Sequence, residues 1–257
     1  MTTVRAVYDF LDAWAPFSTA MSFDNAGLLA GNGKEEVRRA VLALDIMPDV
    51  VREAAGCGAQ LIISHHPVIF DPLRRLFPGS APWLLAQNGL AAICAHTNLD
   101  LAPGGVNTCL AQRLGLSDIR TLGTDVSSGL PESLCGDLSA PMEPRAFALH
   151  VKKVLGCESV EYTEGSKAVH TVGLCSGAGG SYFPADPAAA GIQGFVTGEA
   201  HHHELLAARE AGLTLVVAGH YHTEAVVLDP LREKLSSAFP NVVFSVAVSS
   251  AAPSRFV

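Results

Sequence analysis

The sequence has few charged residues and no excess of basic ones. Only 16% of its 257 residues are charged, and 17 Lys and Arg stand against 25 Asp and Glu, for a formal net charge of -8. Proteins that bind duplex nucleic acid usually present a basic face, so this balance disfavours a nucleic-acid partner. Because 49% of the residues are hydrophobic, we expect a compact globular protein with a sizeable core, and extensive disorder is excluded.

Paired cysteines and long apolar runs are also missing. The six cysteines are scattered without a CxxC pair and lie mostly in apolar stretches, which predicts reduced, buried thiols. No run approaches the length of a membrane span, and the N-terminal MTTVRAVYDFLDAW carries acidic residues where a signal peptide has a basic region and an apolar core. We therefore expect a cytoplasmic protein that is not inserted in a membrane.

The motifs of several large enzyme classes are absent as well. The chain has no Walker loop, no GxSxG elbow and no GxGxxG after its first predicted strand. The glycine-rich run at 176–181 follows a predicted strand and could wrap a phosphate, but such a run is about equally compatible with a plain turn. Candidate functional residues therefore have to be sought among the histidines and carboxylates.

Helical and strand-like patterns alternate along the chain. This alternation is typical of a largely parallel sheet with helices on both faces. In the first part we expect helices at 4–14, 48–57, 81–89 and 106–115 and strands at 40–46, 61–64 and 91–95. In the second part we expect helices at 145–155, 200–211 and 225–237 and strands at 170–176, 194–198, 214–219 and 242–248.

A segment of different composition divides the chain. Residues 121–144 are rich in Gly, Ser, Pro and acidic residues and lose the periodicity, which is typical of a domain boundary. We therefore expect two α/β halves, an N-terminal one at 1–125 and a C-terminal one at 126–257, and the last strand could pack on the first half.

Polar side chains follow the predicted strands of the first half. His65 and His66 come directly after one strand, and His96 and Asp100 follow the next. Open α/β sheets bind ligands at the carboxyl ends of their strands, so these positions favour a metal site. Two adjacent histidines can both be ligands only if the chain leaves strand geometry there, as Pro67 permits. Such histidines can also be simply exposed or hydrogen-bonded, and His96 could be a ligand, a supporting residue or a group that faces the substrate.

A third group of polar residues follows the predicted strand at 214–219. His220 and Glu224 are four residues apart and would share one face of a helix, where Glu224 could bridge two ions. On its own this spacing also occurs on ordinary helix surfaces. His222 would point elsewhere, and His202, in the run at 201–204, either lines the same cleft or is an accidental metal trap. Mixed imidazole and carboxylate donors suit Zn, Mn, Fe or Ni.

Five segments together resemble a known family. FDNAGLLAG, LIISHHPVIF, AHTNLDLAPGGVN, VTGEAHHHELLAAREAGL and AGHYHTE occur in the order expected of the Nif-three-like family, whose bacterial members are often described as type-2 GTP cyclohydrolase I homologues. The resemblance covers nearly the whole chain. It implies two similar α/β/α halves with a metal-binding cleft between them, two divalent metal ions per chain, and toroidal homohexamers built as trimers of dimers. The metal ligands that it implies are His65, His66, Asp100, His220 and Glu224.

The residues and the resemblance together predict metal-assisted hydrolysis. His96, His202 and His222 are candidate proton shuttles, because an imidazole titrates near neutral pH. If the family activity carries over, the substrate is GTP, the imidazole carbon of guanine is attacked, and formate is released. A metal-dependent binding or regulatory protein without turnover, and a hydrolase of another nucleotide or phosphoester, are alternatives that the sequence leaves open.

Overall fold

The computed structural model describes residues 1–257, which form two compact units. The first unit comprises Met1–Ala102 and Leu228–Ala251, and the second comprises Pro103–Val227 and Ala252–Val257. The chain thus leaves the first unit after Ala102 and returns to it after Val227, whereas the sequence predicts one division near residue 125. None of the helices combines the length and the apolar character needed to cross a bilayer.

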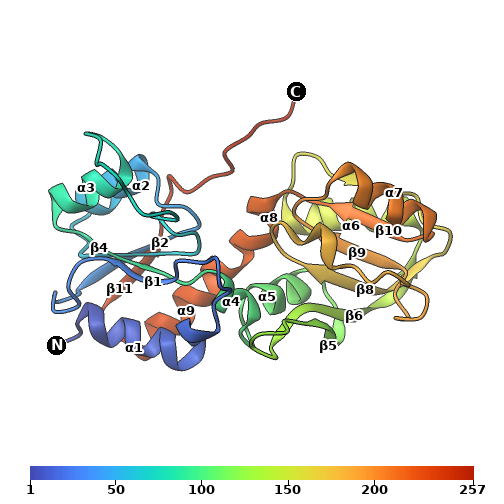
Figure 1. Cartoon of the computed structure of the whole chain (residues 1–257), viewed down its shortest axis with the longest axis horizontal. Coiled ribbons are helices and arrows are strands. Elements are labelled where there is room, and N and C mark those ends of the chain that lie inside the picture. Colours follow the sequence, from blue (N-terminus) through green and yellow to red (C-terminus); the bar gives the residue numbers. More distant parts are fainter. The chain divides into compact units, whose positions relative to one another are not determined.

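The first unit is built on a five-stranded sheet with the strand order β1-β4-β3-β2-β11 (Figure 1). β4, β3, β2 and β11 run parallel, and β1 is an antiparallel edge strand. The return of the chain is explained by β11, which pairs with β2. The elements are α1 Val4–Trp14, η1 Phe17–Thr19, β1 Gly27–Ala30, β2 Arg39–Ala43, α2 Pro48–Gly56, β3 Leu61–Ser64, α3 Ala81–Asn88, β4 Ala91–Cys94, α4 Thr97–Leu101, α9 Leu228–Ala238 and β11 Val243–Val246.

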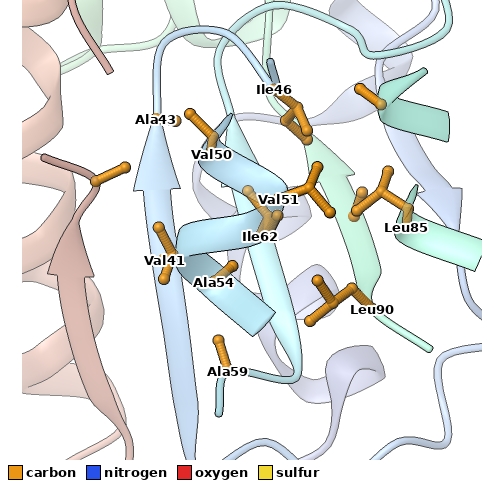
Figure 2. Close-up of a cluster of buried hydrophobic side chains, with 13 residues drawn as sticks. Val41, Ala43, Ile46, Val50, Val51, Ala54, Ala59, Ile62, Leu85 and Leu90 are labelled. Carbon is orange, nitrogen blue, oxygen red and sulfur yellow. The ribbon is translucent and has the colours of Figure 1, made fainter. Parts of the chain in front are cut away.

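Helices cover both faces of this sheet. α2 and α3 pack on one face, where Val51, Ala54 and Leu85 lie against Val41 and Ile62 of the strands (Figure 2). α1 and α9 lie on the other side (Figure 1), and α1 buries Val4, Val7 and Leu11, which recur at helical spacing. The apolar runs of β2, β3 and β4 are therefore covered on both faces, as expected of parallel strands.

The second unit is built on a six-stranded mixed sheet with the order β5-β6-β8-β9-β10-β7. β8, β9 and β10 run parallel, whereas β5, β6 and β7 pair antiparallel with their neighbours. The elements are α5 Val106–Arg113, β5 Ser117–Thr124, β6 Pro131–Met142, α6 Pro144–Leu155, β7 Glu161–Tyr162, β8 Val169–Cys175, η2 Gly179–Tyr182, β9 Gly194–Thr197, α7 His202–Glu210, β10 Thr214–Val217, α8 His220–Glu224 and η3 Ala225–Val227.

The core of the second unit lies on both sides of its sheet. Ala208 of α7 packs on one face against Phe195 and Leu215. Phe147 of α6 is fully buried on the opposite face, where it lies so close to β9 that a Cβ atom at Gly194 would be 3.1 Å from its ring. The three parallel strands are thereby fixed between helices, and their carboxyl ends carry the loops described below.

The prediction that residues 121–144 form an irregular boundary is wrong. Most of this segment belongs to the antiparallel hairpin of β5 and β6. A Cβ atom at Gly136 would lie 2.8 Å from the carbonyl oxygen of Ser117 and 3.0 Å from Leu116, so glycine permits a close approach of the two strands. Pro131 stands at the first residue of β6, where proline is tolerated. Residues typical of turns therefore serve inside strands here.

Candidate metal centre

Three histidines of the first unit lie beyond the carboxyl ends of two adjacent parallel strands. β3 ends directly before His65 and His66, and β4 ends two residues before His96. The ring centroids of these histidines are 5.0, 5.2 and 5.4 Å apart. One ligand nitrogen of each lies within 4.8 Å of the others, so the group could hold a metal ion. The chain has left strand geometry at both His65 and His66, as joint ligation requires.

The three imidazoles share one mode of orientation, because each presents its Nδ1 to an oxygen acceptor. The pairs are His65 with the carbonyl of Ala95 at 3.0 Å, His66 with Oδ1 of Asp45 at 2.8 Å, and His96 with Oδ1 of Asp24 at 2.8 Å. Histidines that bind metals in proteins almost always donate their other ring N–H in this way, which fixes the tautomer and the ring. Nε2 is then the nitrogen that each ring leaves for a metal ion or a proton.

Asp100 joins the same cluster from α4. His96 is the N-cap of this helix, and the N–H of Asp100 donates to the carbonyl of His96 at 3.1 Å, which places Asp100 one turn further on. Its Oδ1 lies 3.5 Å from Nε2 of His65. The first unit therefore brings together four predicted site residues, three imidazoles and one carboxylate.

Asp24 holds His96 more firmly than Asp45 holds His66. The side chain of Asp24 is fully buried, whereas that of Asp45 is 42% exposed. Oδ2 of Asp24 also accepts hydrogen bonds from the N–H of Thr97 at 3.0 Å and from its hydroxyl at 2.5 Å. Burial by itself raises the pKa of Asp24, but the hydrogen bonds from His96 and Thr97 outweigh it, and the net effect lowers the pKa. Asp24 is therefore ionised at neutral pH and accepts the Nδ1–H of His96.

The second unit carries a further histidine and carboxylate at the carboxyl end of β10. Gly219 has φ +88° and turns the chain into α8, on which His220 and Glu224 are the first and last residues. Nε2 of His220 lies 3.0 Å from Oε2 of Glu224, and its Nδ1 lies 2.9 Å from Oε1 of Glu199. His220 thus repeats the pattern of the first unit, with Nδ1 presented to an oxygen acceptor.

The glycine-rich run at 176–181 packs against this pair. Gly177 has φ +59°, and a Cβ atom there would collide with the carboxylate of Glu224. The N–H of Gly177 donates to the hydroxyl of Thr223 at 3.1 Å, and the N–H of Ser176 donates to Asn107 at 2.9 Å. These two N–H groups therefore bind side chains of the fold, and Gly177 supports Glu224 from one side.

His202 and His222 are separate from these donors. Neither belongs to a group of ligand atoms close enough together to hold a metal ion. His202 is exposed at the start of α7, next to His201, whose N–H donates to the carboxylate of Glu204 at 2.6 Å. The ring of His222 packs edge-on against Tyr221.

Three carboxylates that orient histidines are absent from the sequence prediction. Asp45 and Glu199 both lie two residues beyond a strand, β2 and β9 respectively, so the rule that pointed to His65 could have found them. Asp24 lies in the FDNAG turn, which follows no strand and offers no such signal. Its role becomes visible only when the turn is seen beside His96.

The structure thus defines an α/β protein of two units, each with imidazole and carboxylate donors at the carboxyl ends of parallel strands. The model of the Duf34/NIF3 (NGG1p interacting factor 3) family matches residues 2–254, and the chain belongs to this family. The predicted family resemblance and the predicted fold class of two α/β halves are confirmed.

Individual relatives agree with this assignment. A protein of Clostridium perfringens named GTP cyclohydrolase 1 type 2 homolog is 26% identical over 260 residues, which is 98% of each chain. A Streptomyces coelicolor protein of the same name is 33% identical over 237 residues, covering 87% of this chain and 82% of its own. Among solved structures, a hypothetical protein of Staphylococcus aureus has a TM-score of 0.91 and 28% identity and covers 99% of each chain.

Proposed function

We propose that this chain is a dinuclear metal-dependent hydrolase that opens the guanine ring of GTP and releases formate, the reaction of GTP cyclohydrolase I (type 2). The observation that carries the metal-dependent part is the shared orientation of the histidines, each with its Nδ1 at an oxygen acceptor. The choice of GTP is supported by the name of the curated relatives.

The proposed ligands of two divalent ions are His65, His66, Asp100, His220 and Glu224. Three imidazoles and two carboxylates fit Zn, Mn, Fe or Ni, whereas Mg and Ca prefer oxygen donors only. Glu224 offers two carboxylate oxygens, enough to serve both ions. When bound, such ions act as Lewis acids and lower the pKa of water toward neutrality, which is the chemistry that hydrolysis requires.

His96 is the residue that we propose to move the proton. Asp24 accepts its Nδ1–H at 2.8 Å and so leaves Nε2 as the proton acceptor of the ring. The ring centroid of His96 lies 5.2 Å from that of His65 and 5.4 Å from that of His66, and one ring nitrogen of each lies within 4.8 Å of the others, so His96 is close to two proposed ligands. His202 and His222 make no hydrogen bond to a carboxylate, and His96 is therefore preferred among the three candidate shuttles.

The family resemblance further supports a homohexamer, a trimer of dimers, as the assembled form. Sedimentation or light scattering of the purified protein tests this, and a monomer at micromolar concentration would contradict it.

A metal-dependent binding protein without turnover is the second candidate, and one observation favours it. The family description names an interacting factor rather than an enzyme. The same donors would then organise a docking surface. Formate release separates the two candidates.

The proposed function is tested by measuring formate release from GTP before chelation, after chelation and after return of the metal. We expect release to disappear with the metal and to reappear with it. Glu224→Gln should lose bound metal and activity together, whereas Glu210→Gln, an exposed carboxylate of α7, should lose neither. Turnover that survives the loss of one metal in Glu224→Gln would contradict the dinuclear mechanism, and bound metal without formate release would favour another nucleotide, a phosphoester or the binding role.

A further inference from the structure

The second unit contains a cavity whose walls come from four separate parts of the sequence. Its volume is about 310 Å³, within the range of small-molecule sites. The lining residues are Gly156 and Glu158 after α6, Gly198 and Glu199 after β9, Gly219–His222 after β10, and the C-terminal segment Ala252–Phe256. The Glu199–His220 pair and the C-terminal segment therefore line the same cavity.

We infer that the C-terminal segment Ala252–Phe256 is one wall of the substrate site and that Arg255 binds an anionic group, such as phosphate, of the substrate. This inference rests on the proposed function in one respect: the ligand of the cavity is taken to be the substrate of His220 and its partners.

Arg255 is the only lysine or arginine that lines the cavity. It forms no ion pair, and its one hydrogen bond runs from Nη1 to the carbonyl of Ala252 at 3.5 Å. The two carboxylates of the cavity are engaged elsewhere, Glu199 with His220 and Glu158 with the backbone N–H of Phe256. The uncommitted charge is therefore a guanidinium, whose planar fork suits a phosphate or a carboxylate.

The C-terminal segment is attached to the rest of the second unit at a defined point. The N–H of Phe256 donates to Oε2 of Glu158 at 3.2 Å. This bond holds the residue next to Arg255 and so restricts where the guanidinium can reach. Because the segment is otherwise exposed, it can adjust to a bound molecule without disturbing the core.

Aromatic rings complete the lining. Tyr221 and Phe256 both border the cavity, and their faces suit a flat heterocycle. A molecule with a planar ring and a phosphate could therefore contact His220 at one wall and Arg255 at the other. A neutral heterocycle without phosphate would gain nothing from Arg255.

The test compares Arg255→Ala with Arg145→Ala, which removes the same charge from an exposed position on α6 that does not line the cavity. Isothermal titration calorimetry on the metal-loaded protein measures the affinity for GTP, inorganic pyrophosphate and guanosine. We expect Arg255→Ala to weaken GTP and pyrophosphate about 10- to 100-fold and to leave guanosine unchanged, because one charge-assisted contact is lost. Arg255→Lys should lie between, since it keeps the charge and loses the fork.

Equal anion affinities for Arg255→Ala and Arg145→Ala would overturn the inference, and so would a wild-type protein that does not bind pyrophosphate. The outcome is separable from that of the proposed function. Binding of GTP that depends on Arg255, without formate release, would support this inference and contradict the cyclohydrolase reaction. Formate release with an unchanged kcat/KM in Arg255→Ala would support the reaction and overturn this inference.

Discussion

Gly177 offers a sharp test of the position of Glu224. It lies in the turn after β8 with φ +59°, and a Cβ atom there would collide with Oε1 of Glu224 and lie 3.3 Å from Nε2 of His220. Gly191 is a matched control, because its φ is +75° but a Cβ atom there would meet nothing within 4 Å. Alanine at either position suffers the same backbone strain, and only Gly177→Ala displaces a proposed ligand.

The expected magnitudes follow from this difference. A non-glycine residue in the left-handed region costs about 1–2 kcal/mol, so both variants should unfold a few degrees below the wild type when metal-free. The buried carboxylate of Glu224 has little room to yield. Loss of a residue that supports a metal ligand typically lowers metal affinity about 10- to 100-fold. We expect at least this loss in Gly177→Ala and no loss in Gly191→Ala.

The assay is competition for zinc against a chromophoric chelator, with thermal unfolding of the metal-free proteins measured in parallel. Glu224 is supported as a ligand in this orientation if both variants lose the same thermal stability and only Gly177→Ala loses zinc affinity. If Gly177→Ala binds zinc as tightly as Gly191→Ala, Glu224 does not hold the metal in this orientation and the proposed ligand set is refuted.

Three further predictions concern other parts of the chain. Asp24→Asn should lower kcat by a factor on the order of 10² and leave the metal content unchanged, because an amide no longer fixes the proton of His96 on Nδ1. Either a loss of metal or an unchanged kcat would contradict this. Burial raises the pKa of Glu53, but the hydrogen bonds that it accepts from the N–H of Val248 and from the N–H and hydroxyl of Ser249 outweigh burial and lower the pKa. The stability lost in Glu53→Gln should therefore be full above pH about 4.5 and vanish as pH falls through the folded pKa, and a pH-independent difference in denaturation midpoints would refute this. Phe147→Ala should lower the free energy of unfolding of the second unit by about 3–5 kcal/mol, measured by urea denaturation. A loss below about 1 kcal/mol would contradict this and show that neighbouring side chains fill the space of the ring.

The part of the site that follows strand ends could be predicted from sequence. Short apolar segments precede His65, His96 and His220. Parallel strands bring the residues that follow them to the same edge of a sheet. The rule needs only the local pattern and the direction of the strand. Whether these residues act as ligands stays a prediction, since the ligand set rests on the family resemblance.

The parts that depend on distant packing could not be predicted. Gly136 is typical of a turn in sequence, yet it serves a strand because Ser117 and Leu116 lie close to it. β1 falls in a segment that its glycines and Asn make typical of a turn, and it becomes a strand because β4 offers it an edge. Asp24 acquires its role from His96, which is 72 residues away. In each case the deciding neighbour is remote in the chain.

If five residues of this chain ligate two divalent metal ions, elemental analysis of the purified protein will detect those ions. We expect roughly two ions of Zn, Mn, Fe or Ni per chain, removable by a chelator and restored by added metal, with a lower ratio of metal to protein in His65→Ala. A protein that holds no stoichiometric metal, or one whose metal content is unchanged in His65→Ala, would contradict it.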